Sequence, residues 1–429
     1  MSPTSTGPAE HDVRAAVAEQ YERYPFPPRD PADEARRLIV TTLGDLPRAA
    51  DLLWAGRRSL DTLRVLDAGC GTGDSAIYMA QQAPTAQVVA LDASRPSLEI
   101  ARARAHARGL GNVELVHASI LDLPRLGLAP FDYVVCSGVL HHLPDPLEGV
   151  RALLSVLQPA GGLGLMLYAR HGRAPVYQVQ ELLRRVGGDD PLDARVAMAG
   201  EVLSVLSEQH LFKAARLEEQ MLDLSVYGGA GIVDLLLHAC DRAYTVSEVY
   251  DLLASASLEL LSFHRPVLYR PEGYPLTEGL RARVATLTAP EREAVAELLH
   301  GRMIKHELYA ARRGAAAAVP PADDAPAAVR PRVYEPALAA WFQSLRPVAQ
   351  PFHLTSTEGF TITLELTATE CALLAAIDGR RTLQTVFERA AAALRTVGVR
   401  APRIELEVAW RRVAPELQMA GYLGYSLAA

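Results

Sequence analysis

A short apolar run followed by three alternating glycines constrains this chain more than any other stretch. Residues 64–68 are expected to form a buried strand, Gly69, Gly71 and Gly73 follow at alternate positions, and a helix-forming run begins near Asp74. Glycines lack a Cβ atom, so a ligand can lie against the loop backbone. The free N–H groups and the dipole of the following helix favour a negative ligand group. The stretch therefore predicts a strand, a tight ligand-binding loop and a helix.

Strands and helices alternate along the residues that follow this loop. The expected strands are continuous apolar runs, at 64–68, 87–92, 113–117, 132–136, 163–168, 258–264 and 306–312. Helical patterns separate them, at 74–82, 96–108, 147–157 and 247–255. Continuous apolar strands alternating with helices are typical of a parallel sheet covered on both faces. The pattern predicts an α/β fold with a doubly wound, mostly parallel sheet of seven strands.

The chain is long enough, at 429 residues, for more than one domain. Residues 171–243 are mostly helical in pattern and too long for an ordinary α/β connection, so we interpret them as a helical lid insertion. An Ala- and Pro-rich stretch at 314–332 indicates a linker. We therefore expect an N-terminal strap with helices at 1–62, a core at 63–313 and an accessory domain at 333–429.

The accessory domain carries its own signals. Residues 360–366 alternate like a strand, and the next helix opens with Thr367 and Glu370, which form a capping-box pattern. Further elements are expected as helices at 382–394 and 405–414 and a closing strand at 421–425. Helices with a terminal β ribbon predict a small, winged-helix-like α+β domain.

Charge and cysteine content favour some classes of protein over others. The net charge of −7 counts against a nucleic-acid partner. The four cysteines show no C-x-x-C spacing, which indicates neither a zinc site nor a redox motif, and isolated thiols fit a reducing cytoplasm. Residues 1–12 are polar, without the apolar core of a signal peptide, and no apolar run reaches the roughly 18 residues of a membrane span. We therefore expect a cytoplasmic protein with no metal and no membrane association.

Two carboxylates accompany the glycine loop. Asp67 stands at the end of the first strand, and Asp92 follows Gly73 by nineteen residues at the end of the second. Ligands of open α/β sheets bind at this carboxyl edge, where a carboxylate such as Asp92 can accept both hydroxyls of a ribose. The alternative for Asp92 is the N-cap of the next helix.

Together these stretches resemble the class I S-adenosylmethionine-dependent methyltransferases. The loop has the spacing G-x-G-x-G rather than the G-x-G-x-x-G of dinucleotide enzymes. The residues that resemble the motifs of the family are 65–73 for the first, 91–94 for the second, 118–124 for the third, and 137–143 with Asp145 and Pro146 for the segment after the fourth strand. The resemblance is close over residues 64–168.

The resemblance implies S-adenosylmethionine as the cofactor. The residues it assigns to cofactor binding are Asp67, Gly69, Cys70, Gly71, Gly73, Asp92, Ala93, Ser119, Ile120 and Ser137. In this scheme Asp67 orients the methionine amino group and Asp92 takes the ribose hydroxyls. Ser119 departs from the pattern, because many members carry Asp there to bind the adenine amino group.

Catalysis in such a family is chiefly alignment of a nucleophile with the methyl group. A general base is required only when the nucleophile arrives protonated. His141 and His142 follow the fourth strand, where the methyl group should point, and by resemblance we favour His141. Local hydrogen bonding is the alternative role for this pair.

A stiff N-terminal stretch offers two further candidates. Tyr24 begins the stretch 24–28, which contains three prolines that fix the backbone, and Tyr21 lies three residues before it. This segment resembles a strap seen in some bacterial methyltransferases. It either caps the ligand pocket or packs on the core.

The expected activity is methyl transfer to a nucleophilic O, N or C of a small-molecule, biosynthetic acceptor. One alternative is a protein or peptide methyltransferase that holds its substrate with residues 333–429. Another is a non-catalytic protein that only binds the cofactor. Nucleic-acid methylation is disfavoured, since residues 137–140 differ from the Asn-Pro-Pro-Tyr type of many amino-methylating enzymes. A homodimer is left open.

Overall fold

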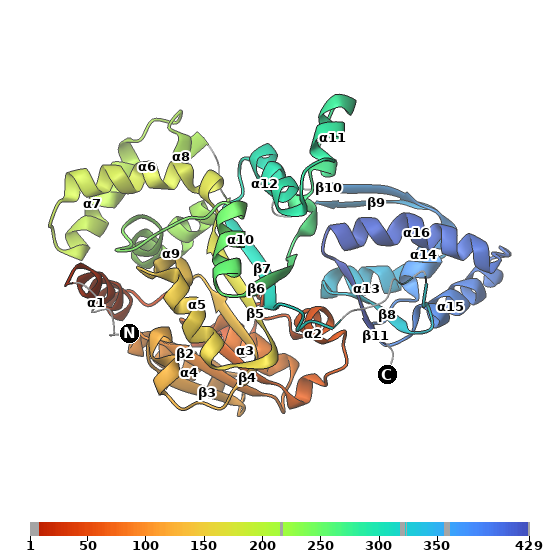
Figure 1. The fold of residues 1–429 in the computed structure, drawn as a ribbon, viewed down its shortest axis with the longest axis horizontal. Coiled ribbons are helices and arrows are strands. Elements are labelled where there is room, and N and C mark those ends of the chain that lie inside the picture. Colours follow the sequence, from red (N-terminus) through yellow and green to blue (C-terminus); the bar gives the residue numbers. More distant parts are fainter. Residues whose placement is uncertain (1–7, 215–217, 318–321, 323, 356–360, 428–429) are drawn as a thin grey trace.

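A seven-stranded sheet forms the centre of the protein. The structure is a computed structural model and describes residues 8–214, 218–317, 322, 324–355 and 361–427. The strands lie in the order β3-β2-β1-β4-β5-β7-β6 (Figure 1). Their bounds are β1 Arg64–Ala68, β2 Gln87–Asp92, β3 Val113–His117, β4 Phe131–Ser137, β5 Leu157–Tyr168, β6 Leu258–Phe263 and β7 Lys305–Arg312. Only β7 runs antiparallel to its neighbours among these strands, which confirms the predicted seven-stranded, mostly parallel sheet.

Helices cover both faces of this sheet. The helices that pack on it are α2 Leu46–Trp54, α3 Asp74–Gln82, α4 Arg95–Ala107, α5 Pro146–Ser155 and α10 Val246–Ser255, and α12 Ala289–His300 packs on α10. Leu66 and Val134 enter one core with α5 and α10, whereas Val65 and Tyr133 enter the opposite core with α2 and α3. Each fully buried aliphatic side chain stabilises the fold by about 1.5–3 kcal/mol. The chain reverses its winding between β1 and β4, where an open α/β sheet binds ligands.

A group of helices, which we call the insertion, follows β5. It comprises α6 Arg170–Gly187, α7 Leu192–Val205, α8 Leu211–Ala214 and α9 Glu218–Leu236. Val179, Leu183 and Val233 belong to a separate apolar cluster between these helices. Gly228 interrupts α9 with φ 54° and ψ −126°. The insertion therefore has a small core of its own beside the carboxyl end of β5.

The N-terminal segment before β1 forms several short helical elements. After α1, Pro8–Arg23, the chain forms a short 3₁₀ turn at Pro31–Ala35 and then α2. Asp45 caps α2 by accepting a hydrogen bond from the Arg48 backbone, and Pro47 occupies its first turn. Because proline is favoured at a helix start, α2 begins here rather than continuing an earlier helix.

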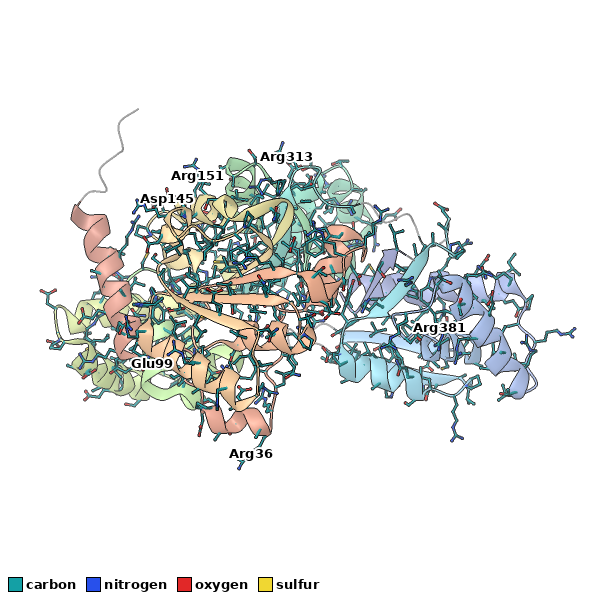
Figure 2. The ribbon with its side chains drawn as sticks, turned by 90° about the horizontal axis from the view of Figure 1, so that it is seen from below. Arg36, Glu99, Asp145, Arg151, Arg313 and Arg381 are labelled. Atoms are coloured by element: carbon teal, nitrogen blue, oxygen red, sulfur yellow. The ribbon has the colours of Figure 1, made fainter. Side chains whose placement is uncertain are left out.

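The C-terminal elements enclose a second core. They are β8 Val329–Val333, α13 Pro336–Ser344, β9 Gln350–Thr355, β10 Thr361–Leu366, α14 Ala368–Ala375, α15 Leu383–Thr396, α16 Arg403–Met419 and β11 Leu423–Leu427. Helices α14, α15 and α16 pack around Phe387 and Trp410, while β9–β10 and β8–β11 form two antiparallel pairs. Figure 2 shows these elements beside the sheet, with Arg381 on their side of the molecule.

Strand β8 begins inside the stretch 314–332 that the composition assigned to a linker and ends at Val333. Its residues pair with β11, from Val329 opposite Leu427 to Val333 opposite Leu423. This strand was missed because its partner lies at the far end of the chain. A winged-helix-like assignment for the C-terminal elements stays a prediction.

Helix α2 carries much of the contact between the C-terminal elements and the core. The Leu427 backbone N–H donates to the Ala55 carbonyl at 2.7 Å, directly after α2. Arg48 donates a hydrogen bond to the Gly421 carbonyl, and Asp51 pairs with Arg332 at 3.2 Å. None of the described helices is both long and apolar enough to cross a membrane.

Candidate active site

The glycine loop after β1 adopts a conformation that other residues rarely reach. Gly69, Gly71 and Gly73 have φ values of 79°, 52° and 95°. A Cβ atom on Gly71 would lie 2.4 Å from the Phe26 carbonyl oxygen, and one on Gly69 would lie 2.3 Å from Val139. Only glycine therefore fits at positions 69 and 71 of this loop. The missing side chains admit the N-terminal strap as well as a ligand.

Asp92 holds the loop to the end of β2. One carboxylate oxygen accepts from the Gly71 N–H at 2.7 Å and the other from the Ser94 N–H at 2.8 Å. The N-cap of α4 is Ser94, which accepts from the Ser97 N–H, so the N-cap alternative for Asp92 is wrong. Each carboxylate oxygen has a further lone pair for a ligand hydroxyl.

Asp67 is the second carboxylate of the site, and it is buried. It is 3% exposed and accepts a hydrogen bond from the Ala76 backbone at 2.9 Å. Burial raises its pKa to about 7, and the hydrogen bond from Ala76 only partly offsets this effect. A positive group placed beside Asp67 would restore its charge, so the position is suited to an ammonium group.

Ser119 serves as a cap rather than as a direct substitute for the expected Asp. Its side chain accepts from the Leu121 N–H, and its own N–H donates to Asp122 at 3.1 Å. This reciprocal pair begins the 3₁₀ turn Ile120–Arg125. The Asp122 carboxylate therefore lies beside Ser119, at the same end of the pocket.

These residues line one cavity of about 640 Å³ at the carboxyl edge of the sheet. The predicted cofactor residues that it brings together are Asp67, Gly69, Cys70, Gly71, Asp92, Ala93, Ser119, Ile120 and Ser137. Gly73 lies below the cavity instead, where a Cβ atom would meet Ala101 at 3.0 Å. Its role in the structure is close packing of α3 against α4.

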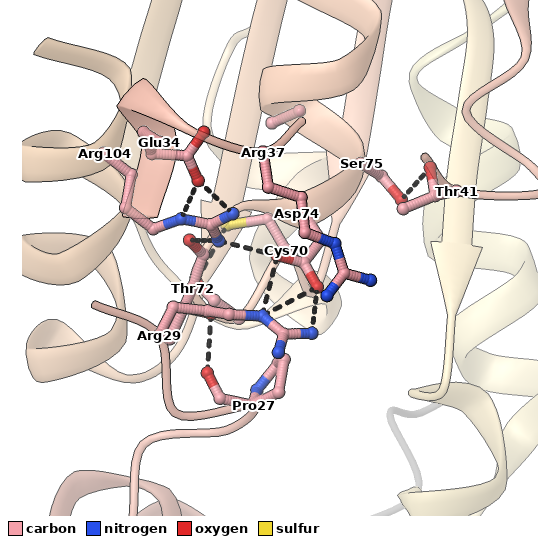
Figure 3. A network of polar contacts seen from close by, with 12 residues as sticks. Pro27, Arg29, Glu34, Arg37, Thr41, Cys70, Thr72, Asp74, Ser75 and Arg104 are labelled. Atoms are coloured by element: carbon pink, nitrogen blue, oxygen red, sulfur yellow. Dashed lines mark hydrogen bonds and ion pairs between the residues drawn. The ribbon is translucent and has the colours of Figure 1, made fainter. Parts of the chain in front are cut away.

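Hydrogen bonds and ion pairs join the N-terminal strap to the glycine loop and to the start of α3 (Figure 3). Thr72 donates to the Pro27 carbonyl at 2.7 Å, and Arg29 pairs with Asp74 at 2.7 Å. Arg104, only 1% exposed, bonds to Asp74, to Glu34 and to the Thr72 carbonyl. The strap thus closes one side of the cavity through buried ionic contacts.

Tyr21 and Tyr24 of the strap have different surroundings. Tyr21 lines the cavity, and its hydroxyl donates to Asp234 at 2.9 Å. Tyr24 turns toward the insertion and donates to the exposed Asp193 at 2.6 Å. The structure therefore keeps Tyr21 as a pocket residue, whereas Tyr24 fastens the strap to α7.

The two adjacent histidines also have different surroundings. His142 lines the cavity, whereas His141 is 0% exposed behind it. His141 Nδ1 accepts from the Tyr168 N–H at 3.3 Å, and among the described residues nothing bonds to its Nε2. The preference for His141 as the pocket histidine is therefore wrong. A resemblance of sequence could not decide which of two neighbours faces inward.

The hydrogen bonding of His142 fixes its tautomer. Its Nδ1 lies 2.7 Å from the Cys240 carbonyl, which can only accept, so Nδ1 carries the proton and Nε2 carries a lone pair. Burial lowers the pKa of His142, although Asp234 and Asp241 act in the opposite direction. The ring also stacks on His238, with 3.6 Å between the centroids. His142 is thus held as a neutral imidazole with a basic nitrogen.

Asp234 completes this end of the cavity. It is 6% exposed, accepts from Tyr21, and lies 3.5 Å from the Tyr168 hydroxyl. Burial raises its pKa. Arg173 lies 3.5 Å from the centre of the Tyr168 ring and pairs with the buried Asp241 at 2.8 Å. A polar wall therefore faces the glycine loop across the pocket.

Comparison with known proteins shows the family to which this chain belongs. A family model described as a methyltransferase domain matches residues 65–161. An uncharacterised protein of Synechococcus sp. is 31% identical over 304 residues, which cover 70% of this chain and 72% of that protein. This chain belongs to the class I S-adenosylmethionine-dependent methyltransferases.

Other relatives of this methyltransferase match shorter or more distant parts. The tRNA 5-carboxymethoxyuridine methyltransferase of Escherichia coli K12 is 34% identical over 145 residues, or 32% of this chain and 54% of that enzyme. The structure of PKMT2 from Rickettsia typhi in complex with AdoHcy matches with a TM-score of 0.64 at 16% identity, over 90% of this chain and 76% of that one. The latter likeness shows the shared fold.

S-adenosylmethionine is the cofactor of this methyltransferase. The cavity fits it, because Gly69 and Gly71 have no side chains and the cavity is lined by the buried carboxylate of Asp67 and the half-buried carboxylate of Asp92. Among the described residues, no group of three or more His, Cys, Asp and Glu side chains is arranged to hold a metal ion.

Sequence reasoning missed Asp234, Tyr168 and Asp122. Asp234 is a polar residue inside the apolar run 232–237, which is the one signal that could have marked it. Tyr168 ends β5, and Asp122 stands three residues after Ser119 in a capping-box spacing. These three residues line the same cavity only because segments that are far apart in the sequence meet in the fold.

Proposed function

We propose that this methyltransferase transfers the methyl group to a hydroxyl or amine of a small-molecule acceptor that binds beside His142. The observation that carries the proposal is the fixed tautomer of His142, whose Nδ1 donates to the Cys240 carbonyl. Its Nε2 lone pair is then available to a group in the cavity. An acceptor that carries a proton on its nucleophilic atom makes use of such a base.

The cofactor end of the pocket binds the methyl donor through its backbone and its carboxylates. In this proposal Asp92 accepts the ribose hydroxyls and Asp67 orients the methionine ammonium group. The carboxylate near the adenine comes from Asp122, which replaces the expected Asp at position 119. Ser119 and Ile120 contribute through the turn that they begin.

The bound sulfonium supplies an activated methyl group. His142 Nε2 would accept the proton that the acceptor atom loses when it takes this methyl group. Asp234 and Tyr21 orient the acceptor by hydrogen bonds, since both lie at this end of the cavity. Alignment within the closed pocket supplies most of the rate enhancement, and proton removal adds a further factor.

The size of the pocket favours a small acceptor. The volume of about 640 Å³ must hold both the cofactor and the reacting end of the acceptor. Helix α1 covers this cavity and is joined to the insertion through the bond from Tyr21 to Asp234. A compact molecule can be enclosed here without opening the strap.

A protein or peptide acceptor is the second candidate, and the β9–β10 pair favours it. A two-stranded sheet has an outer edge on each strand, and an extended peptide can add to such an edge. In this variant of the proposal, residues 333–429 act as an accessory domain that holds the substrate. One side chain of the peptide would then enter the pocket.

A labelling experiment separates these candidates. The enzyme is incubated with methyl-labelled cofactor and with three fractions of a bacterial extract: filtered small molecules, dialysed protein and purified RNA. We expect label in the small-molecule fraction, and a much lower initial rate of labelling with His142→Ala at the same enzyme concentration. Label confined to protein would support the peptide candidate. Label in RNA would contradict our expectation that nucleic acid is not the methyl acceptor.

A further inference from the structure

His238 lies just after α9 and contacts two side chains at the acceptor end of the catalytic pocket. Its imidazole stacks on that of His142, with 3.6 Å between the ring centroids and 20° between the ring planes. Its Nε2 lies 3.1 Å from the Tyr21 hydroxyl, and its Nδ1 lies 3.1 Å from the Cys240 backbone nitrogen. His238 can therefore influence both the base and the hydroxyl group beside it.

These contacts fix the direction of the hydrogen bonds around His238. The Cys240 N–H can only donate, so His238 Nδ1 accepts and carries no proton. A neutral imidazole has one N–H, which must then be on Nε2, and this N–H donates to the Tyr21 oxygen. Burial acts in the same sense, because it lowers the pKa of His238 well below its usual value. The tautomer is opposite to that of His142, whose Nδ1 carries the proton.

The same direction continues from Tyr21 to Asp234. Because the Tyr21 oxygen accepts from His238, its single hydrogen is left for Asp234 Oδ1, which lies 2.9 Å away. A second hydroxyl, that of Tyr168, lies 3.5 Å from Asp234 Oδ2 in donor geometry. Both carboxylate oxygens therefore act as acceptors, and the Tyr21 oxygen keeps one lone pair.

Hydrogen-bond acceptors thus gather where the methyl acceptor is proposed to bind. His142, Tyr21 and Asp234 line the same cavity, and toward it they present the Nε2 lone pair, the remaining hydroxyl lone pair and the carboxylate. A buried acceptor atom that loses water without gaining a donor is unfavourable. A molecule bound at this group of three side chains must therefore supply more than one hydrogen.

A carboxylate suits this group poorly. An ionised carboxylate can only accept hydrogen bonds, so its oxygens would meet the acceptor atoms of the wall. Two cations of the cavity lining already pair with glutamates, Arg14 with Glu148 at 2.6 Å and Lys305 with Glu307 at 3.7 Å. The three side chains therefore discriminate against an anionic acceptor by leaving like groups opposed.

We infer that the methyl acceptor carries a second O–H or N–H group vicinal to the atom that is methylated, and that this atom is not a carboxylate oxygen. Vicinal diols, amino alcohols and diamines have this arrangement. The inference rests on the proposed function, in which His142 takes the acceptor proton. The second donor bonds to Tyr21 and Asp234. His238 is a positioning residue, since it holds the ring of His142 and turns the hydrogen of Tyr21 away from the acceptor.

The first test measures the hydrogen-bond directions without any acceptor. Nitrogen NMR of the full chain with ¹⁵N-labelled histidine distinguishes protonated from bare ring nitrogens, and His238→Gln and His142→Gln assign the two signals. At neutral pH we expect a bare Nδ1 in His238 and a protonated Nδ1 in His142. A doubly protonated His238, or a His238 with its proton on Nδ1, would overturn the inference.

The second test examines the methylated product. Whichever extract fraction takes up label is treated with mild alkali, which releases methyl esters as volatile methanol and leaves methyl ethers and methylamines intact. We expect the label to stay in the product, and mass spectrometry to show an O–H or N–H group vicinal to the methylated atom. Release as methanol, or a product without a vicinal donor, would overturn the inference. Equal labelling rates with wild type and His142→Ala would instead count against the proposed function.

The third test removes one acceptor atom from the wall. With the labelled fraction as substrate, Tyr21→Phe should raise the amount needed for half-maximal rate by about tenfold, whereas calorimetry should give an unchanged AdoHcy affinity. Tyr250→Phe is the matched control, because its hydroxyl bonds to Glu293 at the contact of α10 with α12, and it should change neither value. Unchanged half-saturation in a folded Tyr21→Phe variant would contradict the inference. A fall in AdoHcy affinity would assign Tyr21 to the cofactor and overturn it as well.

Discussion

The two ends of the catalytic pocket are built in different ways. The cofactor end comes from one continuous part of the chain, since β1, β2 and β4 all end there and the loops that follow them form the wall. The acceptor end combines α1, the turn after β4 that carries His142, the end of β5 and α9, which lie far apart in sequence. The first end can be recognised from motifs, and the second has to be seen in the fold.

This difference separates the two tasks of the enzyme. In the proposed binding mode, the loop backbone and the carboxylates of Asp67 and Asp92 hold the donor, and their positions follow from the sheet. The acceptor groups are side chains on elements that the insertion and the strap bring together. Changes at one end should therefore alter cofactor affinity, and changes at the other should alter turnover.

The largest expected effect belongs to the acceptor end. His142→Ala should lower turnover by about 10²–10⁴-fold, because it removes the base, while calorimetry should give an almost unchanged AdoHcy affinity. His141→Gln is the matched control and should mainly lower the melting temperature. If the control variant lost turnover and His142→Ala did not, the assignment of the base would be wrong.

The next largest effect belongs to the cofactor end. Asp92→Ala should weaken AdoHcy binding by about 100-fold, since hydrogen bonds to a charged group contribute about 1.5–3 kcal/mol each. Asp132→Asn is the control, because Asp132 also accepts from a backbone N–H, that of Arg64, at the opposite edge of the sheet. Unchanged affinity in a folded Asp92→Ala variant would overturn the ribose assignment.

The pKa of Asp67 predicts a pH dependence at the same end. Burial raises this pKa to about 7, so the carboxylate is ionised above pH 7 and becomes neutral below it. AdoHcy affinity should therefore fall by up to about tenfold per pH unit as the pH decreases below 7. Asp67→Asn should bind more weakly and remove this dependence, and a wild-type affinity that is flat between pH 5.5 and 8 would argue against an ionic role for Asp67.

The strap gives the smallest of these effects. Arg29→Ala should speed cofactor release by about fivefold, because it breaks a partly buried ion pair with Asp74 worth about 1 kcal/mol. Arg23→Ala is the matched control, since Arg23 pairs with the exposed Asp193 on the insertion. Stopped-flow release of AdoHcy would measure both rates, and equal rates would reduce the strap to a packing element.

Much of the cofactor end follows from local sequence. Gly69 and Gly71 mark a loop that admits no side chain, and Asp92 stands at the end of a recognisable strand. The mostly parallel sheet of seven strands follows as well, because apolar strands and helices alternate. These features depend on a few neighbouring residues, so periodicity and spacing can predict them.

The acceptor end could not be predicted from local sequence. Asp234 and Tyr21 are more than two hundred residues apart and meet only after the insertion folds against α1. The choice between His141 and His142 depends on a turn of the backbone and on the Cys240 carbonyl. Strand β8 likewise needs β11, at the other end of the C-terminal elements. Each of these features arises from long-range contacts that no local pattern encodes.

A crystal structure with AdoHcy bound tests the central claim most directly. The sulfur atom should lie in the cavity with its open side toward His142, and the distance from sulfur to His142 Nε2 should be within about 8 Å, which leaves room for the methyl group and one acceptor atom. The ribose hydroxyls should bond to Asp92. A sulfur atom that faces away from His142, or a ribose that does not contact Asp92, would contradict the account.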